Sequence, residues 1–468
     1  MNPNNSAHHI VIIGGGPGGY EAALAGSQLG AQVTLIERQG VGGAAVLTDV
    51  VPSKTLIATA TAAEAVRTSS SLGIHVGGKN AEVSVDLASV NSRLLDLAKA
   101  QSKEMTEALK KAGVRIVNGT GKLDGNHAVI VEVEGQKPER LEAKTIVLAV
   151  GARPRTLPNA QPDGEKILTW TQLYNLKELP EHMIVVGSGV TGAEFASAYL
   201  SLGCKVTLVS SRDYVLPGED LDAAVLVEDV FRRRGMNILK KTRADKVEKT
   251  ANGVKVYLQD GTSVEGSHCL MAVGSIPNTE NLGLEEAGIA VAESGHIIAN
   301  RVARTSRANV YAVGDCTDFY PLASVASMQG RTAVFHTMGD VAVPTQKRNI
   351  ASNVFTSPEI ASVGWSEHEI QEGLVKGTIQ KILLSTNPRA KMQGIEDGFI
   401  KLFASKGSGT VIGGVVVAPS ASELIYPIAM AVENRLTVDE LATTYTVYPS
   451  LTGAIADAAR ALHNPNLD

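Results

Sequence analysis

HIVIIGGGPGGYEAALAGSQLGAQVTLIE, which spans residues 9–37, is the stretch that decides the fold. His9–Ile13 has the aliphatic, β-branched composition of a buried strand, and Gln32–Ile36 repeats that composition. Between them, a glycine-rich turn leads into Tyr20–Leu29, which is typical of a helix. A strand, a turn, a helix and a second strand within about 30 residues predict a Rossmann-type unit.

The turn of this unit carries the spacing G-x-G-x-x-G at Gly14, Gly16 and Gly19. The first glycine permits the tight turn, the second lets a pyrophosphate approach the backbone, and the third lets helix and strand pack closely. Glu37 ends the second strand, where a carboxylate can accept hydrogen bonds from ribose hydroxyls. The order of these features favours a bound dinucleotide over a turn that is merely rich in glycine.

The same pattern recurs in MIVVGSGVTGAEFASAYLSLGCKVTLVSSR, residues 183–212, with the fingerprint glycines Gly187, Gly189 and Gly192. A helix that ends at Leu202 and a second strand over Lys205–Val209 are expected, and the residues after this strand, Ser210 and Ser211, offer no carboxylate in the ribose position. An arginine near that position suits a 2′-phosphate, so Arg212 is either a phosphate ligand or a solvated surface charge. Two such units imply two dinucleotides, one held permanently and one exchanging, because hydride transfer needs a donor and an acceptor stacked together.

The composition excludes several classes of protein. With 468 residues, 44% hydrophobic and 19% charged, the chain is long enough for about three folded domains. Its net charge of −5 and the scarcity of basic runs argue against a nucleic-acid partner. Three widely separated cysteines favour neither a disulfide framework nor a metal site. No apolar run reaches the 18 residues of a membrane span, so we expect a cytoplasmic protein.

Four further motifs occur in an order that resembles the flavoprotein disulfide reductase family, the lipoamide dehydrogenase-like enzymes. They are Ala149–Ala152, Ala272–Thr279, Val310–Asp315 and Val354–Glu359. The resemblance implies an α/β protein in which the first Rossmann-type domain holds FAD and the second binds NAD(P)H. The last part has expected strands over residues 379–384, 398–404 and 411–418, followed by expected helices over 423–434, 438–443 and 452–462. It would then be an α+β dimerisation domain, which implies a homodimer.

The resemblance implies boundaries for three domains and a set of residues that bind the two cofactors. Residues 1–155 and 278–350 would form a discontinuous FAD-binding domain, 156–277 the NAD(P)H-binding domain, and 351–468 the dimerisation domain. The implied cofactor-binding residues are Gly14, Gly16, Gly18, Gly19, Glu37, Gly43, Lys54, Gly151, Gly187, Gly189, Gly192, Ser210, Arg212, Gly274 and Asp315.

Two departures from the family pattern change the expected chemistry. The family's redox segment carries two cysteines, and here Ala45 and Val50 occupy their positions. Neither side chain forms a thiolate, so dithiol–disulfide exchange is impossible there. The family's proton-transfer pair, a histidine and a glutamate, is replaced by Tyr448 and Gly453. A tyrosine with an ordinary pKa of about 10 is a poor base near neutrality.

Other parts of the family's site are retained. Lys54 matches the lysine that lies beside the flavin, and Glu194 matches its glutamate partner on the nicotinamide-site helix. A cation in that place favours negative charge on the reduced flavin. The residues expected to take part in the chemistry are therefore Lys54, Glu194 and Tyr448.

These features predict a flavoprotein that passes electrons from NAD(P)H directly to a small acceptor, with no protein disulfide. A quinone is the expected acceptor, because it is planar and can stack on an isoalloxazine ring. The segments Gly42–Ala45 and Pro449–Leu451 are similar to those of actinobacterial quinone reductases of this family. Two alternatives stay open: a diaphorase for another acceptor, such as a dye-like oxidant or oxygen, and a non-catalytic flavin redox sensor.

Overall fold

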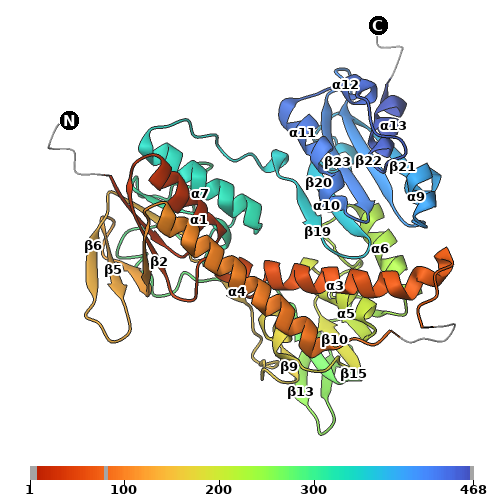
Figure 1. The fold of residues 1–468 in the computed structure, drawn as a ribbon, viewed down its shortest axis with the longest axis horizontal. Helices are drawn as coiled ribbons and strands as arrows, with labels where there is room; N and C mark the ends of the chain where they lie inside the picture. Colours follow the sequence, from red (N-terminus) through yellow and green to blue (C-terminus); the bar gives the residue numbers. More distant parts are fainter. Residues whose placement is uncertain (1–7, 78–82, 464–468) are drawn as a thin grey trace. The chain divides into compact units, whose positions relative to one another are not determined.

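The computed structural model describes residues 8–77 and 83–463, which fall into two compact units (Figure 1). Of the described chain, the first unit takes the residues up to Thr55, Asn91–Arg155 and Gly274–Gln346. The second unit takes the described residues of Leu56–Val90, Thr156–Val273 and those from Lys347 onward. Each unit combines helices with sheets, which confirms the predicted α/β class.

A five-stranded parallel sheet of order β18–β7–β1–β2–β3 forms the centre of the first unit. The predicted first strand is found without change, and His9 pairs with Gln32 at the start of the β1–β2 ladder. The strands of this sheet are β1 (His9–Ile13), β2 (Gln32–Glu37), β3 (Arg115–Asn118), β7 (Thr145–Leu148) and β18 (Val310–Ala312).

Both faces of this sheet are buried. Ile10 and Ile12 belong to a core with helices α1 (Pro17–Gln28) and α7 (Ala323–Met338), whereas Val11 belongs to the core on the other face. Successive side chains of a strand point to opposite faces, which explains why β1 is apolar throughout. Helix α1 begins three residues before the predicted helix, because Pro17 is favourable in the first turn.

The other elements of the first unit are shorter. In a three-stranded antiparallel sheet, the chain turns at residues 124–127 between the first two strands, and a separate two-stranded antiparallel pair joins two segments distant in sequence. They are β4 (Thr120–Leu123), β5 (Ala128–Glu132), β6 (Glu139–Glu142), β8 (Ala152–Pro154), β17 (Ser275–Pro277), α2 (Gly43–Leu47) and η3 (Gly314–Cys316). Helices α3 (Val50–Thr68) and α4 (Leu87–Lys111) contribute residues to both units.

The second unit repeats the Rossmann pattern in a parallel sheet of order β12–β11–β10–β16–β9. The predicted strand Lys205–Val209 is observed without change, and the predicted helix ends at Leu202 as expected. The elements are β9 (Ile167–Leu168), β10 (His182–Val186), β11 (Lys205–Val209), β12 (Asn237–Leu239), β16 (His268–Met271), α5 (Val190–Leu202), α6 (Leu221–Arg233), η1 (Ser69–Leu72) and η2 (Trp170–Asn175). A small antiparallel sheet joins β13 (Ala244–Lys249), β14 (Val254–Leu258) and β15 (Ser263–Gly266).

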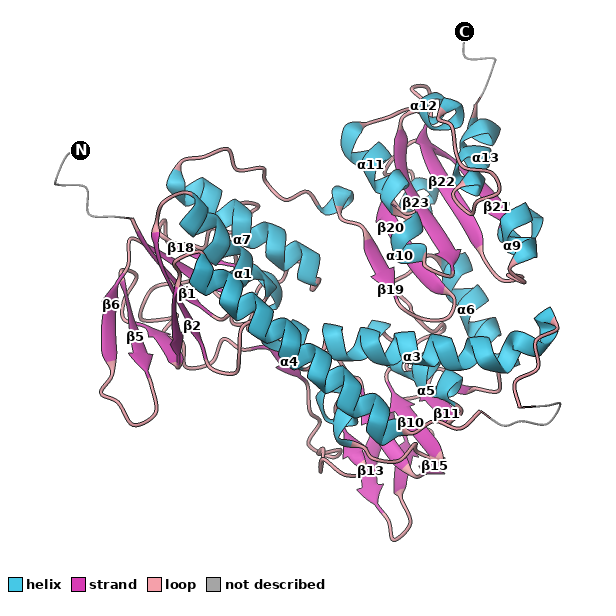
Figure 2. Ribbon diagram, viewed as in Figure 1, coloured by secondary structure: helices cyan, strands magenta, loops and turns pink. Residues whose placement is uncertain are grey.

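The last part of the second unit is an antiparallel sheet of order β19–β20–β23–β22–β21 with helices packed on it (Figure 2). The predicted helix over residues 423–434 is interrupted at Ile425, and its second piece starts with Pro427 in the first turn. The elements are β19 (Ser352–Val354), β20 (Glu359–Gly364), β21 (Gly377–Leu383), β22 (Phe399–Ser405), β23 (Val411–Ala418), α8 (Glu367–Gln371), α9 (Pro388–Met392), α10 (Ala421–Leu424), α11 (Tyr426–Asn434), α12 (Val438–Thr443), α13 (Gly453–Leu462), η4 (Lys347–Asn349) and η5 (Leu384–Thr386).

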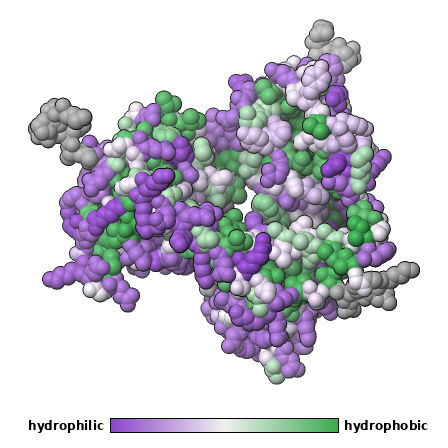
Figure 3. Space-filling view, viewed as in Figure 1, coloured by the Kyte–Doolittle hydropathy of each residue, from purple (hydrophilic) through white to green (hydrophobic). Residues whose placement is uncertain are grey.

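Hydrophilic side chains cover most of the face drawn in Figure 3, with hydrophobic patches between them. Among the helices of residues 8–77 and 83–463, none combines the length and the apolar character needed to cross a bilayer.

Candidate functional site

The first glycine fingerprint lies between β1 and α1, and the structure shows why each of its three positions is a glycine. Gly14 has φ +102°, and a Cβ there would lie 2.3 Å from the carbonyl oxygen of Ala149. A Cβ on Gly19 would lie 1.9 Å from the carbonyl oxygen of Gly14. Gly16 faces open space, with nothing within 4 Å of its Cβ position. The first and third glycines therefore permit tight packing, and the second leaves room for a phosphate at the helix N-terminus.

Glu37 ends β2 and contacts the same turn. Its Oε2 accepts a hydrogen bond from the Gly15 amide at 2.6 Å, and its Oε1 accepts one from the Gln39 amide at 2.7 Å. These contacts hold the carboxylate beside the fingerprint. A carboxylate has about four acceptor positions, so Glu37 keeps capacity for ribose hydroxyls.

The start of α2 also lies against the fingerprint. Gly43 has φ +56°, and a Cβ there would lie 2.9 Å from the Cα of Gly16. The amide of Gly42 donates to the carbonyl of Gly15 at 2.7 Å. The backbone of the segment that corresponds to the family's redox segment therefore contacts the dinucleotide turn, and the binding of a cofactor by Gly43 stays a prediction. Gly18 is closely packed, because a Cβ there would lie 2.7 Å from Val313 Cγ2 and 2.9 Å from the Ala326 carbonyl oxygen, and its part in cofactor binding stays a prediction.

Gly151 and Gly274 flank opposite ends of the two-stranded pair that β8 forms with β17 in the first unit. Both have left-handed backbones, with φ +65° and +94°, and both face open space. The Asn278 amide donates to the Gly151 carbonyl, and the Arg155 amide donates to the Gly274 carbonyl, each at 2.9 Å. The antiparallel pairing of β8 with β17 therefore brings together two motifs that are more than a hundred residues apart.

Asp315 follows β18 in η3, and burial raises the pKa of its carboxyl group, with His296 lowering it to a smaller degree. Within residues 8–77 and 83–463, no side chain or amide hydrogen-bonds to this carboxylate. A largely buried carboxylate without a protein partner is costly unless a ligand satisfies it. This observation fits a hydroxyl group of a bound FAD ribityl chain.

The second fingerprint reproduces the geometry of the first. A Cβ on Gly187, which has φ +111°, would lie 2.2 Å from the Ala272 carbonyl oxygen, and one on Gly192 would lie 1.9 Å from the Gly187 carbonyl oxygen. Gly189 faces open space and precedes the first turn of α5. The two turns thus offer the same cradle for a pyrophosphate.

Ser210 and Arg212 at the end of β11 differ in exposure. Ser210 is fully buried, and its hydroxyl group is 2.7 Å from the Ser188 hydroxyl and accepts the Arg212 amide at 3.1 Å. Arg212 is exposed, and its guanidinium group forms no ion pair in the part of the chain that the structure describes. Arg212 is therefore free to meet an anionic ligand.

The three cysteines are free and buried, and none lies in the former redox segment. Burial raises the pKa of Cys204 and Cys269 to about 12 and that of Cys316 to about 11. Thiols with such pKa values stay protonated near neutrality and are poor nucleophiles. These cysteines pack in the cores and have no evident part in electron transfer.

The three residues expected to take part in the chemistry lie on different elements. Lys54 lies in the first turns of α3 in the first unit, and Glu194 lies buried in α5 of the second unit. Glu194 Oε1 accepts the amide of Phe355 at 2.9 Å. The side chain of Tyr448 is 81% exposed, in the segment before α13. The pairing of Lys54 with Glu194 stays a prediction.

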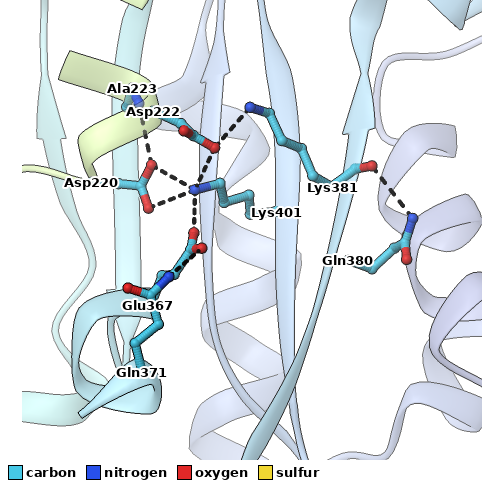
Figure 4. A network of polar contacts seen from close by, with 8 residues as sticks. All are labelled: Asp220, Asp222, Ala223, Glu367, Gln371, Gln380, Lys381 and Lys401. Carbon is cyan, nitrogen blue, oxygen red and sulfur yellow. Dashed lines mark hydrogen bonds and ion pairs between the residues drawn. The ribbon is translucent and has the colours of Figure 1, made fainter. Parts of the chain in front are cut away.

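One polar cluster was not predicted from the sequence (Figure 4). Asp220, Asp222 and Glu367 are the only group of carboxylates in residues 8–77 and 83–463 that has the spacing of a metal site. Lys401 Nζ lies between them, 2.9 Å from both Asp220 and Asp222 and in contact with Glu367. The ammonium group occupies the position that a cation would need, so this cluster is an ion-pair network in which Lys401 and Asp220 are buried and Asp222 and Glu367 are partly exposed.

Two Rossmann-type turns, each with an open central glycine, define an oxidoreductase that binds two dinucleotides. The family model "Pyridine nucleotide-disulphide oxidoreductase" matches residues 8–330, and its dimerisation domain matches residues 350–459. The chain belongs to this family, and FAD and NAD(P)H are its cofactors. The recognition made from the sequence is thereby confirmed.

Comparison with individual proteins shows which members of the family this chain resembles. The chain is 49% identical to "NAD(P)H dehydrogenase (quinone)" of Mycobacterium tuberculosis strain H37Rv over 97% of this chain and 93% of that protein. It is 33% identical to "Dihydrolipoyl dehydrogenase 2" of Haloarcula marismortui over 97% of this chain and 96% of that protein. The crystal structure of LpdA from Mycobacterium tuberculosis has a TM-score of 0.94 at 48% identity, covering 98% of this chain and all of that one.

Proposed function

We propose that the chain is an NAD(P)H:quinone oxidoreductase that passes electrons to its acceptor without a protein disulfide. The observation that carries this proposal is the loss of both redox cysteines, at Ala45 and Val50, while both dinucleotide turns keep their geometry. The printed name of the 49% identical mycobacterial relative supports a quinone as the acceptor. FAD, when bound, supplies an electron carrier that accepts hydride equivalents from NAD(P)H and releases them to the quinone.

The residues of the chain bind and orient the reactants in this proposal. The backbone of Gly14–Gly19 holds a pyrophosphate, Glu37 accepts the ribose hydroxyls and Asp315 accepts a ribityl hydroxyl. The ammonium group of Lys54 would stabilise negative charge that develops near the reactive ring. Glu194 is already fixed by the Phe355 amide, which orients its carboxylate.

The proposed assembly is a homodimer, in line with the dimerisation domain that ends the chain. Tyr445 is fully exposed and Tyr448 is 81% exposed in the single chain, and Tyr426 of α11 is 66% exposed. Large aromatic side chains that are left in water in this way are typical of surfaces covered by a partner. We assign these residues to contact with a second copy, with Tyr448 as the group that replaces the family's histidine.

We also propose the domain boundaries expected from the sequence. The FAD-binding domain comprises residues 1–155 and 278–350, the NAD(P)H-binding domain residues 156–277, and the dimerisation domain residues 351–468. The free state of all three cysteines is consistent with a reducing, cytoplasmic location.

A panel of electron acceptors tests the proposed function directly. The purified protein should be yellow, its flavin absorbance should fall on anaerobic addition of NADPH or NADH, and 1,4-benzoquinone or a naphthoquinone should sustain many turnovers. A protein whose flavin is reduced but which turns over no quinone is a diaphorase for another acceptor or a redox sensor. A colourless protein that releases no flavin on denaturation would contradict the proposal as a whole.

A further inference from the structure

The ends of strands β11 and β12 bring two segments of the second unit together. The Ser210 amide donates to the Leu239 carbonyl at 2.8 Å, and the Thr242 amide donates to the Ser210 carbonyl at 3.1 Å. The Lys241 amide donates to the Arg212 carbonyl at 3.3 Å. Residues 210–213 and 239–242 therefore form one wall at the carboxyl ends of two parallel strands, where a Rossmann-type unit binds the adenosine ribose.

An ion pair lies on this wall. Asp213 is the first carboxylate after β11, and Lys241 Nζ is 2.8 Å from its Oδ1. The hydrogen bond and the charge of Lys241 lower the pKa of Asp213, and the same hydrogen bond raises the pKa of Lys241. Lys241 has φ +58°, an uncommon backbone for a residue other than glycine, and its amide donates a hydrogen bond to the Arg212 carbonyl in this conformation. The wall thus presents a carboxylate that is already neutralised by its neighbour.

The other charges of the wall are arranged differently. Lys240 Nζ is 2.9 Å from Glu228 Oε1 and 5.4 Å from the centre of the Tyr214 ring. Arg232 contacts the same oxygen of Glu228 at 3.1 Å, and Lys240 lowers the pKa of Asp213 to a smaller degree than Lys241 does. The guanidinium group of Arg212 has no ion-pair partner among residues 8–77 and 83–463. The charge that meets a 2′-phosphate is therefore set by Arg212 and by whether Asp213 is neutralised.

We propose that the Asp213–Lys241 ion pair sets the discrimination between NADPH and NADH, which makes Lys241 a specificity-determining residue. The inference rests on the proposed function, in which the second Rossmann-type unit binds NAD(P)H. With Lys241 in place, Asp213 carries no net repulsion toward a 2′-phosphate and one of its oxygens is occupied. Without Lys241, the free carboxylate repels the phosphate and gains the ability to accept a hydrogen bond from a ribose 2′-hydroxyl.

Equilibrium binding of two adenosine nucleotides to the FAD-loaded protein isolates this effect. Adenosine 2′,5′-bisphosphate and 5′-AMP differ only in the 2′-phosphate, and calorimetry measures both without any turnover. Lys241→Ala should weaken binding of the bisphosphate by about 3- to 30-fold, the range expected for one exposed charge at close approach. Binding of 5′-AMP should change by less than about twofold or become slightly tighter.

Two further variants make the test specific. In Asp213→Asn protein, the additional change Lys241→Ala should leave bisphosphate binding within about twofold, because no carboxylate remains to be neutralised. Lys246→Ala is the matched control: Lys246 is another exposed lysine in an ion pair, with Glu248 on β13, and its loss should leave both affinities unchanged. The ratio of flavin reduction rates with NADPH and NADH should follow the same pattern.

The outcomes separate this inference from the proposed function. Bisphosphate binding that is unchanged in Lys241→Ala, or that falls equally in the Asp213→Asn background, overturns the role of the ion pair while cofactor binding stands. A wild-type protein that binds neither nucleotide overturns the proposed function and the inference with it. Arg212→Ala protein is compared in the same assay. If it binds the bisphosphate as tightly as wild type while Lys241→Ala weakens binding only when Asp213 is present, the proposed arginine contact is wrong and the role of the ion pair stands.

Discussion

Lys401 Nζ lies 2.9 and 3.0 Å from the two carboxylate oxygens of Asp220, and both side chains are almost fully buried. Asp220 is the N-cap of α6, and its Oδ1 also accepts the Ala223 amide at 3.2 Å. Burial by itself would lower the pKa of Lys401, but hydrogen bonds with Glu367, Asp222 and Asp220 raise it above its usual value. The lysine of strand β22 therefore stays charged and fixes the start of a helix in the Rossmann-type part of the same unit.

Removing this charge should destabilise the protein strongly. Lys401→Met would leave Asp220 buried beside two other carboxylates, and the cation that remains in the cluster, Lys381, contacts Asp222 and not Asp220. Breaking a buried pair in this way costs about 3–5 kcal/mol, which should appear as a lower urea midpoint. Lys381→Met is the matched control, because the ion pair of Lys381 with Asp222 is partly exposed and should contribute less than about 1 kcal/mol. Equal midpoints for the two variants would show that the buried network contributes little.

The Rossmann-type parts could be predicted from the sequence because their signals are local. The strand His9–Ile13 and the strand Lys205–Val209 were predicted with the observed bounds, since a few aliphatic residues before and after a glycine turn are enough. Helix α3 was not predicted, because its Thr- and Ala-rich sequence has little amphipathic pattern. The strand β20, Glu359–Gly364, was also missed, since its apolar residues neither alternate simply nor form a continuous run.

The site shows the same contrast between local and distant signals. The fingerprint glycines and Glu37 were predicted because their spacing in one short segment carries the information. The contact of Lys401 with Asp220 joins residues 181 positions apart, and the pair of Asp213 with Lys241 depends on the register of β11 beside β12. No pattern within a single segment indicates such pairings, so the structure was needed to find them.

Lipoamide and glutathione disulfide should not be substrates. Ala45 and Val50 cannot form the exchanging thiol pair, so the rate with either disulfide should be negligible beside the rate with 1,4-benzoquinone. Restoring both cysteines in the double variant Ala45→Cys, Val50→Cys should not create good lipoamide reduction, because Tyr448 and Gly453 still replace the proton-transfer pair. Rapid lipoamide turnover by that double variant would show that Tyr448 and Gly453 matter less than proposed.

Replacement of Lys54 tests its proposed electrostatic role. Lys54→Met keeps a long flexible side chain but removes the charge, and it should slow flavin reduction by about 10- to 1000-fold, or about 1.4–4 kcal/mol of barrier. Stopped-flow absorbance under anaerobic conditions measures this step without involving the acceptor. Lys54→Arg serves as the control that retains the charge. If Lys54→Met protein is reduced as fast as wild type, the lysine has only a structural role.

The final prediction concerns Arg212 and the choice of nicotinamide cofactor. No carboxylate ends β11, Ser210 is buried with its hydroxyl group shared between Ser188 and the Arg212 amide, and the Arg212 side chain is exposed. We therefore expect both cofactors to be used, with NADPH preferred. Arg212→Ala should raise the Michaelis constant for NADPH by about 10- to 150-fold, since a charge-assisted contact with phosphate contributes about 1.5–3 kcal/mol.

The constant for NADH should hardly change in this variant, because NADH lacks the 2′-phosphate that Arg212 would contact. Arg212→Lys keeps a positive charge but lacks the planar guanidinium group, so its Michaelis constant for NADPH should lie between those of the wild type and Arg212→Ala. Rising salt should reduce the preference of the wild type for NADPH over NADH, because salt screens exposed charges. The ratio of the two Michaelis constants of Arg212→Ala should stay nearly constant. Equal changes with both cofactors, or no change with either, would mean that Arg212 is an ordinary solvated residue and that the preference has another source.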